Sequence, residues 1–132
     1  MGLNVLIDAF ARVVTRHPGA RLWLTGRGPA EDALREQIQR HRLESTVRLL
    51  GFVPESELPR LLNAADAAVM PSLDLEGFGL ATAEALACGT PVLGSRAGAT
   101  PELLEPLDPG LLFPPASLDG LAHRLEDALR HP

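Results

Sequence analysis

The stretch AAVMPSLDLEGFGLATAEALACGTPVLG, residues 67–94, decides the predicted fold. Its apolar start, Ala67 to Met70, predicts a short buried strand, and a glycine-containing loop follows it. Leu80 to Ala87 predicts a helix, and Val92 to Gly94 predicts a second strand. A strand, a helix and another strand on short connections form one unit of a parallel sheet.

The same alternation extends outward from this unit in both directions. Upstream, helical spacing of apolar residues predicts a helix at residues 3–16, and apolar runs predict strands at 22–25 and 47–50. The other predicted elements are a helix from Glu31 and Asp32 to Arg40 and Arg42, a helix capped by Ser56 with Leu58, Leu61 and Leu62 on one side, a strand at 111–113, and a closing helix capped by Ser117 with Leu118, Leu121, Leu125 and Leu129 inward. The pattern predicts one α/β domain over residues 1–132, an open, doubly wound parallel sheet with helices on both faces.

Composition and charge exclude several classes of function. The net charge is −5, and the twelve basic residues are arginines scattered along the chain, so we expect no nucleic-acid partner. No apolar run is long enough for a membrane span, and no signal peptide is recognisable. The single cysteine, Cys88, excludes an internal disulfide and a multi-cysteine metal site, which favours a cytoplasmic protein. The simplest interpretation of Cys88 is a small buried side chain.

Ligands of open parallel sheets bind outside the carboxyl ends of the strands. The loops after Thr25, Leu50, Met70 and Gly94 should therefore carry the function, and each contains a glycine. In the third loop, glycines beside a predicted helix start leave free backbone N–H groups at the positive end of the helix dipole. This arrangement predicts a phosphate-binding site.

Glu76 and Glu84 flank the predicted helix start with seven residues between them. If the intervening residues are largely helical, the two backbones lie about 12 Å apart. The carboxyl groups of a hydrolytic pair lie only roughly 5 to 9.5 Å apart. The spacing therefore favours two carboxylates that bind opposite ends of one extended polar ligand.

The stretch Glu76-Gly77-Phe78-Gly79-Leu80, followed by Glu84-Ala85 and Gly89-Thr90-Pro91-Val92, resembles the E-x7-E signature of glycosyl transferases group 1. These are retaining glycosyltransferases of the two-domain GT-B type. Further family-like motifs occur in order along nearly the whole chain, at residues 2–10, 26–29, 51–53, 65–66, 71–72, 98–102 and 110–113. The resemblance implies a Rossmann-like, C-terminal, donor-binding domain whose substrate is a UDP-, GDP- or ADP-sugar.

The resemblance also assigns roles to individual residues. Glu84 would bind the ribose hydroxyls, Glu76 would approach the transferred sugar as the catalytic carboxylate, and backbone N–H groups of Phe78 to Leu80 would hold the diphosphate. The Gly51-Phe52-Val53 turn would line the base pocket, and the Gly26-Arg27-Gly28 turn would lie near the nucleotide. The implied enzyme needs no metal and no other cofactor. Among other charged residues, Arg27 and Arg96 could reach a phosphate or form surface ion pairs, and Glu102 fits a helix-dipole partner better than a ligand.

The chain departs from the family pattern at its start. In the family, a strand and a turn precede the first helix and supply an arginine and a lysine that hold the diphosphate, whereas this chain has Met1-Gly2 there and no lysine. In the strand order 3-2-1-4-5-6 that strand is central. We therefore expect the fragment to be loosely packed or self-associated. Without the acceptor-binding domain of the parent enzyme, we also expect it to be inactive alone.

Two other functions remain open. A noncatalytic nucleotide-binding or interaction module could keep the same pocket, and a sugar-nucleotide epimerase of the same two-domain build is disfavoured by the E-x7-E signature. The four histidines, His17, His41, His123 and His131, are far apart and form no predicted metal or catalytic pair.

Overall fold

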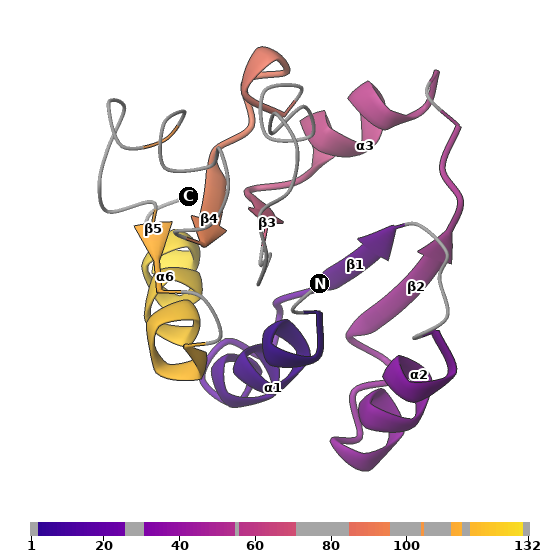
Figure 1. The fold of residues 1–132 in the computed structure, drawn as a ribbon, viewed down its shortest axis with the longest axis vertical. Coiled ribbons are helices and arrows are strands. Elements are labelled where there is room, and N and C mark those ends of the chain that lie inside the picture. The colour runs from indigo at the N-terminus through magenta and orange to yellow at the C-terminus, as the bar shows by residue number, and fades with distance from the viewer. Residues whose placement is uncertain are drawn as a thin grey trace.

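The structure is a computed structural model, and it describes residues 3–25, 31–54, 56–70, 85–95, 104, 112–114 and 117–130. Nine elements are defined within these ranges (Figure 1). In chain order they are α1 (Leu3–Val14), β1 (Leu22–Thr25), α2 (Glu31–Arg40), β2 (Val47–Gly51), α3 (Leu58–Ala64), β3 (Ala68–Met70), β4 (Val92–Ser95), β5 (Leu112–Phe113) and α6 (Leu118–Arg130). Each described strand lies within one residue of its predicted bounds.

All strand pairs are parallel, which confirms the predicted α/β class. The strands form two sheets, however, one with the order β1-β2 and one with the order β3-β4-β5. β1 and β3 face each other across the middle of the molecule (Figure 1). Within the described ranges they are not paired, so the expected single sheet is divided between β1 and β3.

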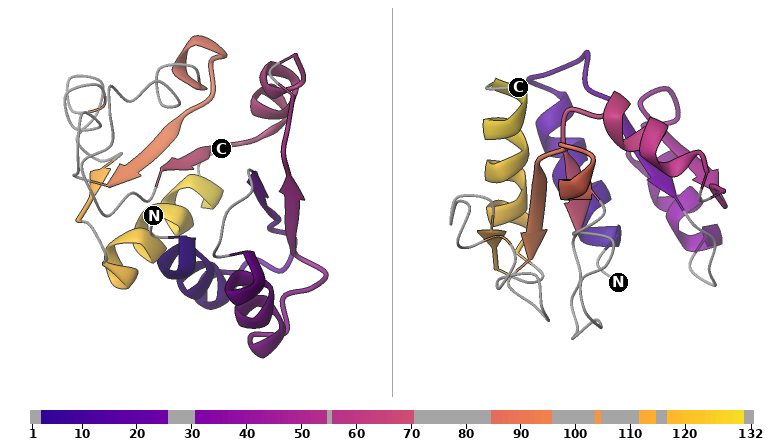
Figure 2. Two further views of the ribbon diagram at one scale, coloured as in Figure 1. Left: turned by 45° about the vertical axis from the view of Figure 1, so that its right-hand side comes forward. Right: turned by 90° about the horizontal axis from the view of Figure 1, so that it is seen from above.

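The helices α1 and α6 lie side by side and hold the two sheets together (Figures 1 and 2). The apolar residues of α1 recur at helical spacing, and Ile7 in the middle of this helix is fully buried. One core cluster contains α1 and α6 side chains together with Leu24 of β1, Leu93 of β4 and Phe113 of β5. Both sheets therefore share this core. A smaller cluster consists of Ala85, Val92, Leu104 and Leu112.

The ends of two helices differ from the predicted bounds. α1 ends at Val14 rather than at residue 16, since the N–H groups of Arg16 and His17 both bond to the carbonyl of Val13 in a closing turn. α2 ends at Arg40, and Arg42 lies beyond it with a positive φ of 56°. Arg42 is therefore part of the terminating turn and not of the last helical turn.

The two predicted helix caps have different outcomes. Ser117 caps α6 as predicted, because its Oγ accepts a hydrogen bond of 3.0 Å from the N–H of Gly120. The prediction for Ser56 is wrong. The N-cap of α3 is Glu57, which makes no side-chain cap bond, and the first turn is built by the carbonyl of Pro54, which accepts from the N–H groups of Glu57 and Leu58.

Cys88 is only half-buried, so the prediction of a buried thiol is too strong. Gln37 is buried, and its Nε2 donates to Asn4 O and to Asp8 Oδ1, both at 2.7 Å. These two bonds hold α2 against α1.

No helix in the described part of the chain is both long and apolar enough to span a membrane.

Candidate functional site

The candidate site is formed by the carboxyl ends of the strands, since the strands within each of the two sheets are parallel and end on the same side of their sheet. Segments that are far apart in the sequence meet at these ends. The arrowheads of β3 and β4 point the same way in the right-hand view of Figure 2. Thr25, the last residue of β1, is the register partner of Gly51, the last residue of β2. Met70 at the end of β3 is the partner of Gly94 in β4. All four loops predicted to carry function therefore start at or next to a residue with a register partner, as expected for a parallel sheet.

The last residue of β2, Gly51, has a left-handed backbone conformation. Gly51 is buried and has a φ of 71°, a conformation that glycine adopts without strain. The register with β1 shifts between Leu24 and Thr25, so β2 carries one extra residue just before this turn. The chain then turns outward, and the ring of Phe52 is 71% exposed while Val53 is partly buried. An apolar ring this exposed is available for contact with a planar ligand.

The Gly51-Phe52-Val53 turn lies beside Thr25 at the end of β1, and Gly26-Arg27-Gly28 follow Thr25 directly in the sequence. The two segments that the resemblance assigns to the nucleotide thus follow paired strand ends. Most of the other predicted site residues fall outside the described ranges. They are Gly26, Arg27, Gly28, Glu76, Gly77, Phe78, Gly79, Leu80 and Glu84, and with them Arg96 and Glu102.

Ala85, which directly follows Glu84 in the sequence, is among the described residues. Ala85 is fully buried, residues 85–87 are helical, and Gly89 ends the turn with a φ of 79°. The buried hydroxyl of Thr90 donates a hydrogen bond of 2.6 Å to the carbonyl of Leu62 in α3. The end of this helix is therefore fixed to α3, and it anchors the backbone next to Glu84.

The sequence interpretation treated Gly89-Thr90-Pro91-Val92 only as part of a family signature. In the structure each of these residues has a structural role. Pro91 O accepts a bond of 2.8 Å from the N–H of Ala68, and Val92 is fully buried. The motif thus aligns β4 with β3. Gly89, a glycine directly after a helical pattern, was the sequence signal for the end of the helix at residues 85–87.

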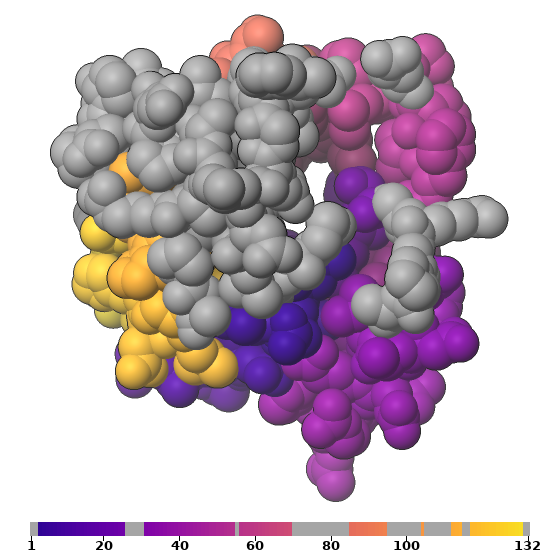
Figure 3. Space-filling view, in the orientation of Figure 1, coloured from indigo at the N-terminus to yellow at the C-terminus, as the bar shows by residue number. Residues whose placement is uncertain are grey.

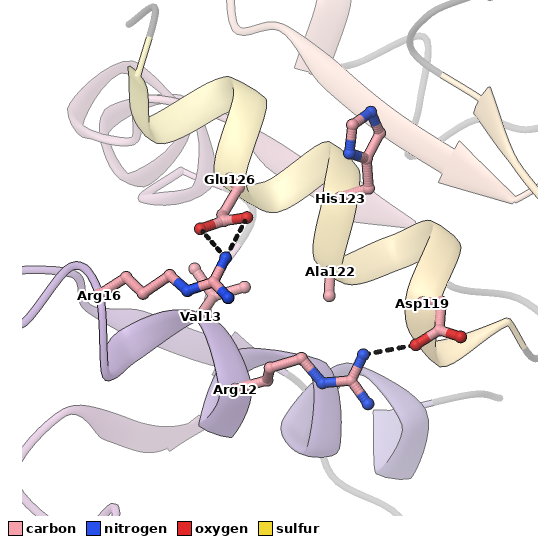
Figure 4. A pocket seen from close by; sticks show the side chains of 7 residues that line it. All are labelled: Arg12, Val13, Arg16, Asp119, Ala122, His123 and Glu126. Atoms are coloured by element: carbon pink, nitrogen blue, oxygen red, sulfur yellow. Dashed lines mark hydrogen bonds and ion pairs between the residues drawn. The ribbon is translucent and has the colours of Figure 1, made fainter.

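A second surface feature is the groove between α1 and α6 (Figure 4). It is lined by Arg12, Val13, Arg16, Asp119, Ala122, His123 and Glu126. In it, Arg16 Nη1 lies 3.2 and 3.3 Å from the two carboxylate oxygens of Glu126, and Arg12 bonds to Asp119. The Arg16 hydrogen bond lowers the pKa of Glu126, and the charges of Arg16, Arg130 and His17 act in the same direction. Because its charges are paired with one another, the groove is a helix-to-helix contact rather than a ligand site.

Two of the histidines lie beside carboxylates. Nε2 of His41 lies 2.8 Å from Asp8 Oδ1, and Nε2 of His123 lies 3.5 Å from Asp127 Oδ2. Within the described ranges no three His, Cys, Asp or Glu side chains form a group that could hold a metal ion.

Comparison with known proteins agrees with the motifs. The family model described as "Glycosyl transferases group 1" matches residues 1–132. Glycogen synthase of Mycobacterium tuberculosis is 37% identical over 131 residues, which are 99% of this chain and 31% of that protein. The chain thus spans about a third of the length of the curated relatives it matches.

Solved structures show the same fold. Anabaena Alr3699/HepE, in complex with UDP and glucose, superimposes with a TM-score of 0.86 at 32% identity, covering 98% of this chain and 35% of that one. The C-terminal domain of a glycosyl transferase group 1 family protein, LpcC of Francisella tularensis, has a TM-score of 0.86 at 27% identity, covering 98% and 69%.

Proposed function

Because the chain belongs to the glycosyl transferases group 1 family, we propose that it is the donor-binding domain of a retaining glycosyltransferase. Its ligand is a nucleoside diphosphate sugar, and the glycosyl group passes to an acceptor held by another domain of the parent enzyme. The transfer uses no metal ion. Charge on the departing diphosphate is instead stabilised by backbone N–H groups at a helix start.

One observation carries this proposal. The Gly51-Phe52-Val53 turn, the end of β1 and the end of β3 all lie at carboxyl ends of parallel strands, where such sheets bind nucleotides. The similar protein HepE has been solved with UDP, with UDP and glucose, and with UDP-glucose. A nucleotide on the same edge of this chain would contact the exposed Phe52 ring.

The anchoring of Ala85 supports a ribose-binding role for Glu84. A carboxylate that accepts two hydrogen bonds from neighbouring hydroxyls must be held in one position, or the gain is lost to side-chain and backbone entropy. Glu84 directly precedes the fully buried Ala85, and Thr90 ties the same short helix to α3. We assign the diphosphate to the N–H groups of Phe78 to Leu80 and the transferred sugar to Glu76.

A thermal-shift titration with UDP, GDP and ADP tests the proposal. A ligand at a hundredfold excess over its dissociation constant adds about 2.7 kcal/mol of stability, which raises Tm by several degrees in a domain of this size. We expect one nucleotide to raise Tm, and Glu84→Ala to abolish the rise.

Glu36→Ala is the matched control, because Glu36 is an exposed carboxylate on α2. It should leave the rise in Tm intact. The absence of a shift with all three nucleotides at millimolar concentration would contradict nucleotide binding by this chain. A shift that survives Glu84→Ala would contradict the assignment of the ribose site.

A further inference from the structure

Thr90 connects a firmly packed segment to a loosely packed helix. It is only 3% exposed. Its N–H donates to Ala85 O at 3.0 Å, and its hydroxyl donates to Leu62 O of α3 at 2.6 Å. Because threonine is β-branched, its χ1 angle is restricted and the hydroxyl keeps its direction. Thr90 therefore holds one of these two segments in place relative to the other.

The segment around Thr90 is the firmly packed one. Ala85 and Val92, on either side of Thr90 in the sequence, are fully buried in one core cluster. Pro91 O, directly after Thr90, accepts a hydrogen bond of 2.8 Å from the N–H of Ala68 in β3. Packing and main-chain bonds thus fix the backbone of Thr90 independently of its hydroxyl.

The helix α3 is the loosely packed one. None of its seven residues is buried, and its N-cap residue, Glu57, makes no side-chain cap bond. The helix lies at the margin of the molecule in the space-filling view (Figure 3). Among the described residues, the bond from Thr90 to Leu62 is the only hydrogen bond between residues 54–65 and a distant segment. If this bond is lost, α3 should therefore move before the Thr90 segment does.

The position of α3 also affects the turn proposed for the base. The Gly51-Phe52-Val53 turn follows β2 and leads into Pro54, whose carbonyl accepts from the N–H of Leu58, the first residue of α3. The turn is thus held by β2 at one end and by α3 at the other. A helix of seven residues is only about 10 Å long. Motion of α3 at Leu62 should therefore reach this turn.

We propose that Thr90 is a positioning residue for base recognition, because its bond to Leu62 fixes α3 and, through α3, the turn that selects the base. The inference rests on the proposed function, since it takes the Gly51-Phe52-Val53 turn as the segment that contacts the base. A turn that is already fixed loses little conformational entropy when the base binds, so it binds the base more tightly. The ribose and the diphosphate are assigned to residues outside α3. Only the base-dependent part of the affinity therefore depends on Thr90.

Thr90→Val tests the inference, because valine keeps the shape of threonine and lacks the hydroxyl. Calorimetric titration gives the Kd of UDP, GDP and ADP at a temperature at which every variant is folded. We expect the preferred nucleotide to bind about fivefold more weakly, since one hydrogen bond is lost. The other two should lose less, so the ratio of the Kd values falls toward one. Thr90→Ala removes the same donor and should repeat this result, whereas Thr90→Ser keeps the donor and should restore most of the selectivity.

Gln37→Met is the matched control, because Gln37 is also a buried polar residue and its two hydrogen bonds join α2 to α1. This variant should lower stability and leave the ratio of the Kd values unchanged. An unchanged ratio in Thr90→Val and Thr90→Ala would mean that Thr90 acts on stability alone, and it would overturn the inference but not the proposed function. A wild-type chain that binds all three nucleotides equally would have the same meaning. The absence of binding by any nucleotide would contradict the proposed function, and the inference with it.

Hydrogen exchange tests the structural step without a nucleotide. The amides of Leu61 and Ala65 are bonded within α3 and its C-cap, and the amide of Gly89 is bonded in the turn before Thr90. In Thr90→Val we expect exchange at Leu61 and Ala65 to become about fivefold faster, and exchange at Gly89 to stay as in the wild type. Equal acceleration at all three amides, or none at Leu61 and Ala65, would overturn the inference.

Discussion

Two helices of this protein end in the same backbone motif with different residues at its critical position. After the helical residues 85–87, Gly89 N–H bonds to Leu86 O and Thr90 N–H bonds to Ala85 O. After α2, Arg42 N–H bonds to Gln39 O and Leu43 N–H bonds to Ile38 O. Both are Schellman endings, in which the penultimate residue takes the left-handed conformation. That residue is Gly89 with a φ of 79° in one case and Arg42 with a φ of 56° in the other.

Exchanging the residue type at these two positions should change stability in opposite directions. A Cβ at Gly89 would meet no atom within 4 Å, so Gly89→Ala adds backbone strain without a clash. The left-handed conformation costs a non-glycine residue about 1–2 kcal/mol, and the loss of glycine's freedom in the unfolded chain offsets about 0.4–1 kcal/mol of that. We expect Gly89→Ala to lower the free energy of unfolding by about 1 kcal/mol, and Arg42→Gly to raise it by about 0.5–1 kcal/mol.

Guanidinium chloride unfolding followed by circular dichroism measures both changes, with an unaltered m-value as the check on two-state behaviour. Gly19→Ala is the matched control, since a Cβ there also meets no atom within 4 Å and its φ is not left-handed. It should be neutral or slightly stabilising. The reasoning would be refuted if Gly89→Ala were as harmless as Gly19→Ala, or if Arg42→Gly destabilised the protein.

Three further substitutions test the core, the α3 contact and the ion pairs. Ile7→Ala removes a fully buried side chain from the shared core and should cost about 2–5 kcal/mol in chemical unfolding; a cost near zero would mean that α1 is not packed as described. Thr90→Val removes the hydrogen bond from the Thr90 hydroxyl to Leu62 O and should lower the free energy of unfolding by about 1 kcal/mol. Thr90→Ser keeps the donor and should lower this free energy less. The pKa of Glu126 is lowered, mainly by the hydrogen bond from Arg16, so its contribution to stability is complete above the ordinary glutamate pKa and disappears as the pH falls through the lowered value. Unfolding free energies measured across the acid range should therefore fall less steeply in Glu126→Gln, and identical pH profiles would exclude this role.

The strands were predictable because short apolar runs end at glycine or proline. Leu22–Thr25, for example, has the bounds expected from its sequence, since Gly26 follows it. The start of α3 was not predictable in the same way. Ser56 is a common capping residue, but here the carbonyl of Pro54 already organises the turn. Local sequence does not show which of two competing hydrogen-bond arrangements the chain adopts.

The sequence predicts the family and the fold, but not the contacts that hold the segments around the candidate site. The family and the Rossmann-like α/β fold of the C-terminal half of GT-B were correctly inferred from ordered motifs. The bond between Thr90 and Leu62 joins residues 28 positions apart, and no periodicity in the sequence indicates it. The half-exposed Trp23 was likewise unexpected, because its strand has the composition of an interior strand.

Because the strands form two sheets, the two halves of the candidate site follow strands of different sheets. The turns after β1 and β2 belong to one sheet, and the segment that begins after Met70 belongs to the other. No described strand pairing connects these halves, and their relative position is set by the shared core around α1 and α6. Side-chain packing allows small rotations of one sheet relative to the other, whereas the hydrogen bonds between paired strands fix which residues lie opposite each other. The part of the site proposed for the base and the part proposed for the diphosphate therefore depend on this shared core for their relative position.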